Sequence, residues 1–594
     1  MVRKDVDGRV TTYAYDRAGR LVEAVGPDSE LRYQYDRRGL TKAELVDGRP
    51  ILYAYDVLGR RTRRTTPTGH VTSYAYGADG LPHRLTSGGH RIDFTHDAAG
   101  RELTRVFGDA ITMTSARDAA GRLSTQHITA GGRDVSSRAY TYRADGHLVS
   151  VADRLSGTRA FDLDRAGRVT AVHARGWTER YAYDDAGNQT SASWPSRHPG
   201  SEATGPRAYT GTTLTRAGDV RFEYDALGRV TLRQKTRLSR KPGTWRYAWD
   251  TENRLTSVTT PDGTRWRYRY DPLGRRTAKQ RLAADGETVL EETRFTWDGL
   301  TLCEQTSHRP DDPTVVALTW DHRDVVPLAQ TERILTADAR QEEIDRRFFA
   351  IATDLIGTPT ELIDETGGIA WRTRSTLWGT TAWPRNCSAY TPLRFPGQYY
   401  DPETGLHYNY FRHYDPETGR YTSPDPLGLA PAPNPVGYVD NPLIGCDPLG
   451  LMPKYTREER ARKRLDKVLD EIVERAQDGG FKKRHDYHGD TMHGMSDERV
   501  LDILKNPDAV YHSTGTSGRL TFRQGEDIVV ADGLGNTQGQ AITAYGPSGI
   551  KGDSGVEALG GKPTDPGAPV THEDIVEGRI PAKGGYLAPA VQIR

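Results

Sequence analysis

Two copies of Asp-Pro-Leu-Gly-Leu contain the residues in this chain best suited to chemistry. They begin at Asp425 and Asp447, inside a Pro- and Gly-rich stretch that spans residues 420–451. Amide hydrolysis needs one carboxyl group as a base toward water and a second as an acid toward the leaving group. Two carboxyl groups held about 3 Å apart cannot both ionise, so a confined pair of aspartates would divide the roles in this way. The same residues also fit plain Asp-Pro turns.

A short repeat fills the chain before this stretch. Tyr15-Asp16-Arg17-Ala18-Gly19-Arg20 returns in similar form, and the early copies start at 15, 35, 55, 76 and 96. Residue types alternate before and after the motif, which is typical of strands, and Asp-x-x-Gly supplies a turn whose glycine tolerates positive φ. Each unit is therefore predicted to be a hairpin, and many hairpins side by side would form one long sheet. We expect the repeated Asp and Tyr to shape turns and pack.

This array resembles the YD repeats of Rhs proteins, teneurins and insecticidal-toxin C proteins. The resemblance implies a mainly β fold, in which a YD-repeat β-hairpin sheet spirals into a hollow shell around a C-terminal payload. We assign residues 1–300 to the YD-repeat β shell.

Residues 301–451 resemble the Rhs core-associated domain. The motifs that carry this resemblance are Phe348-Phe349, Asp354-Leu355-Ile356-Gly357-Thr358-Pro359, the run from Arg394 to Asn409, and its echo Tyr414-Asp415-Pro416-Glu417-Thr418-Gly419-Arg420-Tyr421. The resemblance implies aspartyl-type autoproteolysis after the Leu of the second Asp-Pro-x-Gly-Leu. Asp425 and Asp447 would then be the acidic pair, Leu451–Met452 the scissile bond, and Arg420 a residue that orients a carboxylate or the peptide.

Residues 452–594 read as a separate small α+β toxin domain. We predict a helix that starts after Thr456, a second helix from Asp497 to Lys505 capped by Ser496, and then an antiparallel meander. Its strands are expected at 509–513, 518–523, 527–531 and 540–545. After Tyr545 the Gly- and Pro-rich sequence is expected to be ordered coil. This element order and the final Ile-Thr-Ala-Tyr strand resemble the barnase/EndoU/colicin/RelE-like ribonucleases.

Metal-free RNA cleavage needs a base, an acid and cations around the phosphate, and histidine titrates near neutrality. His488 and His493 are the favoured acid and base, with His485 behind them as a substrate contact. Arg519 and Lys551 are candidate phosphate contacts, while Thr543 and Tyr545 sit where related folds place polar active-site residues. No cofactor or metal is expected. In the competing interpretation the three histidines bind a metal and the payload is a metal-dependent DNase.

Composition excludes several other classes. The net charge of +1 gives no general argument for a nucleic-acid or membrane partner, and no apolar run is long enough to span a bilayer. Three scattered cysteines form neither a disulfide framework nor a metal knuckle. Met1-Val-Arg-Lys-Asp shows no signal peptide, and because the first repeat starts almost at once, one interpretation is that the chain is the tail of a longer protein.

The sequence therefore predicts an Rhs-type toxin that encapsulates its payload, cleaves itself after Leu451 and releases a ribonuclease used in interbacterial competition. Its expected partners are a cognate immunity protein, an RNA substrate (tRNA among the candidates), and secretion machinery or an N-terminal delivery region, without stable membrane insertion. The protein would be secreted or delivered by the producer, and the toxin domain would act in the target-cell cytoplasm. A non-enzymatic adhesion or structural YD-repeat protein is the alternative from a different class.

Overall fold

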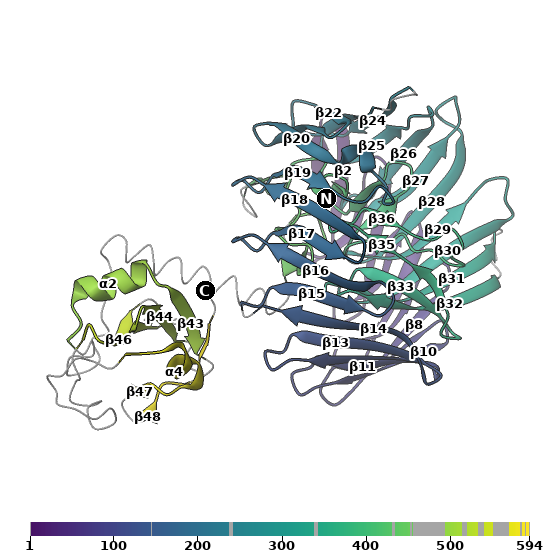
Figure 1. Ribbon diagram of the computed structural model, residues 1–594. Helices are drawn as coiled ribbons and strands as arrows, with labels where there is room; N and C mark the ends of the chain where they lie inside the picture. Colours follow the sequence, from purple (N-terminus) through teal and green to yellow (C-terminus); the bar gives the residue numbers. More distant parts are fainter. Residues whose placement is uncertain are drawn as a thin grey trace. The chain divides into compact units, whose positions relative to one another are not determined.

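The structure is a computed structural model, shown as a ribbon in Figure 1. It describes residues 2–143, 145–236, 241–337, 343–429, 434–451, 454–455, 494–513, 519–532, 540–549, 569–582, 585–588 and 590–592. The chain divides into two compact units: one holds residues 1–141 and 149–454, and the other holds residues 455–594 with the short segment 142–148. None of the described helices is long and apolar enough to cross a membrane.

One antiparallel sheet of 34 strands dominates the first unit, within the residues described. Its first half comprises β1 (Val2–Val6), β2 (Arg9–Tyr15), β3 (Leu21–Val25), β4 (Glu30–Tyr35), β5 (Thr41–Val46), β6 (Arg49–Tyr55), β7 (Arg61–Thr65), β8 (Val71–Tyr76), β9 (Pro82–Ser87), β10 (His90–His96), β11 (Glu102–Phe107), β12 (Ile111–Arg117), β13 (Leu123–Ala130), β14 (Arg133–Tyr142), β15 (Leu148–Asp153), β16 (Gly157–Leu163) and β17 (Val169–Ala174). Its second half comprises β18 (Trp177–Tyr183), β19 (Gln189–Ser193), β20 (Gly205–Thr210), β21 (Thr213–Ala217), β22 (Val220–Tyr224), β23 (Val230–Lys235), β24 (Gly243–Trp249), β25 (Leu255–Thr259), β26 (Arg265–Tyr270), β27 (Arg276–Leu282), β28 (Val289–Asp298), β29 (Thr301–His308), β30 (Thr314–Arg323), β31 (Val326–Thr336), β32 (Glu343–Thr353), β33 (Pro359–Asp364) and β34 (Ile369–Arg372), with the 3-10 turn η1 (Ser201–Ala203) between β19 and β20.

The described pairings join each strand to the next one in the chain, as hairpins in series should. The mainly β fold predicted from the repeats is confirmed. The expected change near residue 300 has no counterpart in the hydrogen bonding, because the sheet continues through β29 and on to β34. Sequence similarity between hairpins fades there, while the backbone pattern persists.

The repeated motif forms a turn that its own Asp and Arg side chains stabilise. Asp16 Oδ1 accepts hydrogen bonds from the backbone N–H groups of Ala18 and Arg20, and Oδ2 accepts one from Arg20 Nε at 2.7 Å. The Arg20 guanidinium lies over the ring of Tyr35 in the next unit, 4.5 Å from its centroid, and the Tyr35 hydroxyl donates to Leu21 O at 2.7 Å. The same contacts recur at Asp56, Arg60 and Tyr76. The structural role expected for the repeated Asp and Tyr is confirmed.

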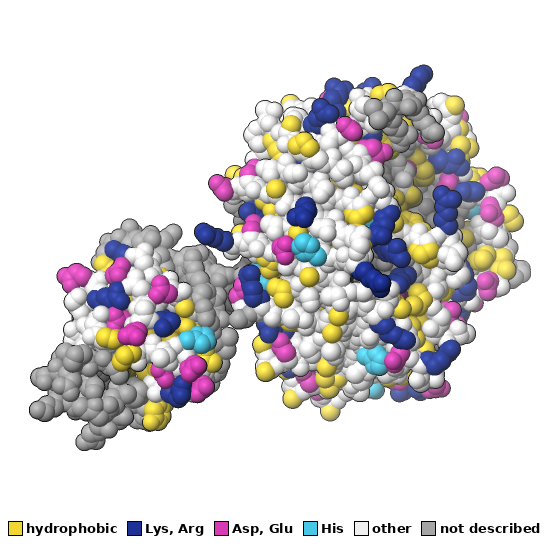
Figure 2. Space-filling view, viewed as in Figure 1, with side chains coloured by type: hydrophobic (Ala, Val, Ile, Leu, Met, Phe, Trp, Pro, Cys, Tyr) yellow, Lys and Arg dark blue, Asp and Glu magenta, His cyan; other side chains and the backbone are white. Residues whose placement is uncertain are grey.

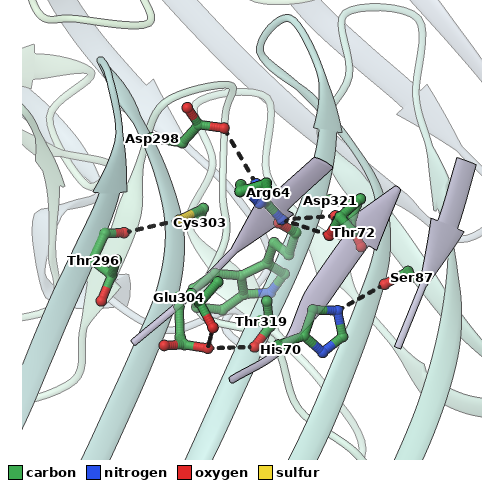
Figure 3. Close-up of polar contacts among 12 residues, drawn as sticks. Arg64, His70, Thr72, Ser87, Thr296, Asp298, Cys303, Glu304, Thr319 and Asp321 are labelled. Carbon is green, nitrogen blue, oxygen red and sulfur yellow. Dashed lines mark hydrogen bonds and ion pairs between the residues drawn. The ribbon is translucent and has the colours of Figure 1, made fainter. Parts of the chain in front are cut away.

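The sheet curls so that side chains of early strands contact side chains of much later strands. Arg64 of β7 donates to Asp321 of β30 at 2.7 Å, and Figure 3 shows this pair beside Thr72, Asp298 and the buried Glu304. Both members of the Arg64–Asp321 pair are almost fully buried. Buried charges are tolerated only when they are paired and hydrogen-bonded, so this network fixes how β7 lies against β30.

Arg64→Met is therefore expected to destabilise the shell by about 3 kcal/mol, because it leaves the buried Asp321 carboxylate without its cation. Urea unfolding followed by tryptophan fluorescence measures the change. Arg63→Met on the same strand is the matched control; its side chain is exposed, so a change within about 0.5 kcal/mol is expected. Equal midpoints for the two variants would contradict the role of the pair.

Short strands follow the long sheet and end at the Asp-Pro stretch. They are β35 (Arg374–Ser375), β36 (Thr381–Ala382), β37 (Tyr399–Asp401), β38 (Leu406–Asn409), β39 (Arg412–Asp415), β40 (Arg420–Tyr421), β41 (Gly445–Cys446) and β42 (Lys454–Tyr455). β37 to β40 form a four-stranded sheet whose side chains are nearly all buried. A salt bridge of Arg276 to Asp401 (2.7 Å) ties it to the long sheet. This small sheet carries several of the residues described below.

The second unit contains α2 (Asp497–Lys505), β43 (Ala509–Ser513), β44 (Leu520–Gln524), β45 (Asp527–Ala531), β46 (Ala541–Tyr545), α4 (His572–Glu577), β47 (Pro581–Ala582), β48 (Gly585–Tyr586) and β49 (Ala590–Gln592). The predicted helix, its Ser496 cap and the four predicted strands are confirmed, with shifts of at most two residues at strand ends. The prediction of coil after Tyr545 was wrong for residues 572–577, 581–582, 585–586 and 590–592. α4 has a Thr571 capping box, and β49 joins the sheet beside β43. The helix expected after Thr456 lies outside the described residues.

Candidate functional site

Asp447 lies at the centre of a buried hydrogen-bond network. Its Oδ1 accepts the backbone N–H of Leu451 at 3.0 Å, and its Oδ2 accepts the Tyr421 hydroxyl at 2.8 Å. Asn409 Nδ2 donates to both the Asp447 carbonyl (2.7 Å) and the Tyr421 hydroxyl (2.8 Å). The side chain is 1% exposed. The carboxylate thus contacts Leu451, whose carbonyl carbon belongs to the expected scissile bond.

Arg412 joins the two aspartates. Its Nη2 lies 2.7 Å from Asp425 Oδ2 and 3.3 Å from Asp447 Oδ2. Its Nε donates to the carbonyl of Gly450, and its guanidinium stacks on the Tyr421 ring, 3.6 Å from the centroid. The described contacts show a cation between the carboxyl groups rather than a hydrogen bond from one to the other. The arginine can therefore position both acids and polarise the peptide that precedes Leu451.

Asp425 differs from Asp447 in its surroundings. Burial raises the pKa of the Asp425 carboxyl above its ordinary value, against the opposing effects of the Leu427 N–H and Arg412, and the charge of Asp447 adds to the rise. The raised pKa favours the protonated form of Asp425, as a general acid requires, while donors from three residues point at the Asp447 carboxylate.

Backbone contacts fix the path of the second Asp-Pro-Leu-Gly-Leu. Phe411 N–H donates to Leu449 O at 3.1 Å. Gly450 has φ +73°, and a Cβ there would lie 2.8 Å from Asn409 O, so only glycine fits without strain. Gly397 likewise passes so close to Pro448 that a side chain would collide with its carbonyl. The tertiary structure thus presses the junction segment against β38 and β39.

The sequence-based expectations for this junction have mixed outcomes. Asp425, Asp447 and Leu451 are brought together, and Met452 lies outside the described residues. Arg420 does not contact either aspartate: its guanidinium donates to Asn188 Oδ1 at 2.6 Å and to Thr212 O, because β40 turns it toward the long sheet. Arg412 takes the place expected for Arg420. Sequence reasoning also missed Asn409 and Tyr421, whose repeated Tyr- and Asn-containing motifs gave no signal that distinguished them from packing residues.

In the second unit, Thr543 and Tyr545 lie on β46 with one residue between them, and Arg519 lies just before β44. Burial raises the pKa of the Tyr545 hydroxyl, while contact with the Thr543 side chain and the charge of Arg519 oppose the rise. His485, His488, His493 and Lys551 lie outside the described residues. Among the residues that are described, no group of three or more His, Cys, Asp or Glu side chains could hold a metal ion.

A histidine that sequence reasoning missed lies on α4. His572 Nδ1 is 3.0 Å from the Tyr511 hydroxyl, and their rings lie 5.6 Å apart. Tyr511 is almost fully buried and its pKa is raised by burial, against the effect of Arg523. Coil was expected after Tyr545, so this pairing was not predicted. It depends on α4 packing onto the sheet.

Family comparisons agree with the architecture. A teneurin YD-shell model matches residues 339–430, and an RHS repeat model matches residues 2–31, 35–71 and 249–288. The Tc holotoxin pore of Photorhabdus luminescens superposes with a TM-score of 0.61 at 19% identity, over 76% of this chain and 25% of that chain, which shows a shared fold. The first unit is therefore a YD-repeat shell. The chain belongs to the Rhs family of YD-repeat proteins.

Two curated relatives share the same level of identity. The probable deoxyribonuclease RhsB of Dickeya dadantii is 32% identical over 61% of this chain and 24% of its own length. The double-stranded DNA deaminase toxin A of Burkholderia cenocepacia is 32% identical over 75% of this chain and 33% of its own length. The chain thus spans about a quarter to a third of these proteins. Since equally similar relatives carry different enzyme names, the similarity does not define a payload chemistry.

Proposed function

We propose that this chain is the shell and payload of an Rhs-type toxin, which cleaves itself between Leu451 and Met452. The observation that carries the proposal is the Asp447 carboxylate, which binds the Leu451 N–H and is joined to Asp425 through Arg412. Asp447 would act as the base toward water and Asp425 as the acid toward the leaving amine. Water would add to the Leu451 carbonyl carbon, the C–N bond would break, and the Met452 nitrogen would take the proton.

Asp425 gives this mechanism a pH dependence. Its pKa in the folded chain lies above the ordinary 3.8, so the proton is present below the folded pKa and lost as pH rises through it. We expect the cleavage rate to fall as pH rises through that range. The rate can be measured by diluting denatured full-length chain into buffers of different pH and following the fragments by gel. A rate that climbs steadily with pH across this range would remove Asp425 from the role of acid.

For the payload we propose a metal-independent endoribonuclease acting in the cytoplasm of a target bacterium, neutralised in the producer by a cognate immunity protein. The order of α2 and the antiparallel strands β43 to β46 supports it, as do Thr543 and Tyr545, whose side chains interact on β46. On the face that Figure 2 shows, Lys and Arg side chains are scattered among Asp and Glu side chains. A phosphate site on this face would therefore be small. The names of the two relatives favour a second candidate, an enzyme acting on DNA.

Inducing residues 452–594 in bacteria separates these candidates. The ribonuclease predicts loss of total RNA that persists with a chelator and disappears with His488→Ala or His493→Ala, whereas DNA stays intact. His572→Ala is the matched comparison, because that ring is held by Tyr511 on α4. Activity that depends on His572 alone would overturn the assignment of His488 and His493. Damaged or deaminated DNA with intact RNA would replace the ribonuclease with the second candidate.

A further inference from the structure

A cavity of about 530 Å³ in the shell is lined by residues of β2, β25, β26 and β27. Three arginines of β26, Arg265, Arg267 and Arg269, form part of its wall, together with Arg9 of β2. Asp28, in the turn between β3 and β4, is the one carboxylate among the described lining residues. The formal net charge of the wall is therefore +3. An excess of positive charge in a concave site attracts anions.

The alternation of side chains along β26 places its three arginines on one face of the strand. Arg267 is in register with Ser257 of β25 and Gln280 of β27, and its Nε donates to Gln280 Oε1 at 2.9 Å. The next residue, Tyr268, points to the opposite face, where its hydroxyl donates at 2.9 Å to Glu403 between β37 and β38. The three arginines therefore face away from the small sheet and its carboxylates.

Contacts with other wall residues locate the charged ends of these side chains. Arg9 Nη2 lies 3.0 Å from Asp28 Oδ2, and Arg269 Nη2 donates to the Asp28 backbone carbonyl. The Arg265 guanidinium lies against Gly286, where an added Cβ would collide with its Nη1. Asp28 and Gly286 both line the cavity. The guanidinium groups of these three arginines, and not only their aliphatic stems, therefore lie at the wall.

Most of this positive charge has no counter-ion in the fold. Within the described residues Arg265, Arg267 and Arg269 form no ion pair, and Asp28 is paired with Arg9. Arg9 Nε is buried and finds no acceptor in the same part of the chain. A guanidinium group binds phosphate oxygens two at a time. Three unpaired charges around one cavity suit an anion with more than one charge, so phosphate groups fit it better than a single carboxylate does.

We propose that this cavity binds a ligand that carries two or more phosphate charges. Arg265, Arg267 and Arg269 would donate to its phosphate oxygens, while Arg9 keeps the Asp28 carboxylate paired. A soluble diphosphate and a phosphate-bearing lipid headgroup offer the same chemistry, and the experiment separates these two sources. The site lies apart from the Asp-Pro junction and from the second unit, so it adds a binding activity to the shell whether or not the chain cleaves itself.

Isothermal titration of the full-length chain with inorganic pyrophosphate tests the site. Wild type should bind, and the affinity should fall as salt is raised. Arg265→Gln or Arg267→Gln should raise the dissociation constant at least about tenfold, because each removes a charge-assisted hydrogen-bond donor. Arg180→Gln, at an exposed arginine of β18 off this wall, should bind like the wild type. Asp28→Asn should tighten binding about threefold or more, since it removes the negative charge of the wall, and misfolding does not produce such a gain.

Co-sedimentation with vesicles distinguishes the two sources of phosphate. Vesicles of phosphatidylcholine with phosphatidic acid are compared with vesicles of phosphatidylcholine alone. Sedimentation that needs phosphatidic acid and is lost in Arg265→Gln supports a lipid headgroup, whereas binding of pyrophosphate without sedimentation supports a soluble ligand. Binding of neither probe at about 1 mM phosphate overturns the proposal. Equal binding by wild type, Arg265→Gln and Arg180→Gln overturns it as well, because the affinity would then not come from the wall of this cavity.

Discussion

Asp447→Asn is expected to leave the full-length chain uncut. An asparagine keeps an oxygen that can accept the Leu451 N–H, but its amide cannot take a proton from water. Wild type should give a fragment of residues 452–594, about 15 kDa on the usual domain scale, with Met452 at its N-terminus. Intact mass and N-terminal sequencing of the purified protein measure both outcomes. We expect a loss of at least about 10³-fold in cleavage rate, since a catalytic base is removed.

Asp440→Asn is the matched control for this substitution. Asp440 lies between the two Asp-Pro motifs and its side chain is exposed, so the variant should cleave like the wild type. Thermal unfolding of the Asp447→Asn shell should stay close to that of the wild-type shell in the same buffer. A fragment that still begins at Met452 in Asp447→Asn would end the aspartyl mechanism, and a wild-type chain that stays whole would end self-cleavage.

Arg412→Met is expected to slow cleavage by about 10²-fold or more. The substitution removes the cation that joins Asp425 to Asp447 and the donor to Gly450 O, while methionine keeps part of the apolar contact with Tyr421. Without Arg412 the two buried carboxyl groups repel each other, so the pH at which the remaining cleavage declines should rise. Cleavage rates of denatured chain refolded at several pH values measure both effects.

Two further variants show whether Arg412 acts by position or only by charge. Arg412→Lys keeps the charge but cannot reach both aspartates and the Gly450 carbonyl with a planar fork, so partial recovery is expected. Arg420→Lys should cleave normally, because Arg420 contacts Asn188 and Thr212 instead of the aspartates. A cleavage defect in Arg420→Lys together with an active Arg412→Met would reverse the assignment of the two arginines.

The repeats made most of the shell predictable. Each Asp-x-x-Gly turn is stabilised by its own side chain, as Asp16 shows with Ala18 and Arg20, so its structure depends on only a few neighbouring residues. The same holds for α2, where Ser496 accepts from Arg499 N–H and specifies the helix start locally. The sheet continues past residue 300, where the motif has faded, because backbone strand pairing does not depend on that motif.

At the junction, too, some residues could be predicted from the sequence and others only from the tertiary structure. By itself the sequence singled out Asp425 and Asp447 as the candidate pair, since the doubled Asp-Pro-Leu-Gly-Leu marks them in a Pro- and Gly-rich stretch. Only the tertiary structure decided which arginine joins them. Arg412 and Arg420 both lie on strands of the small sheet, and their surroundings in the fold point one at the carboxyl groups and the other at Asn188.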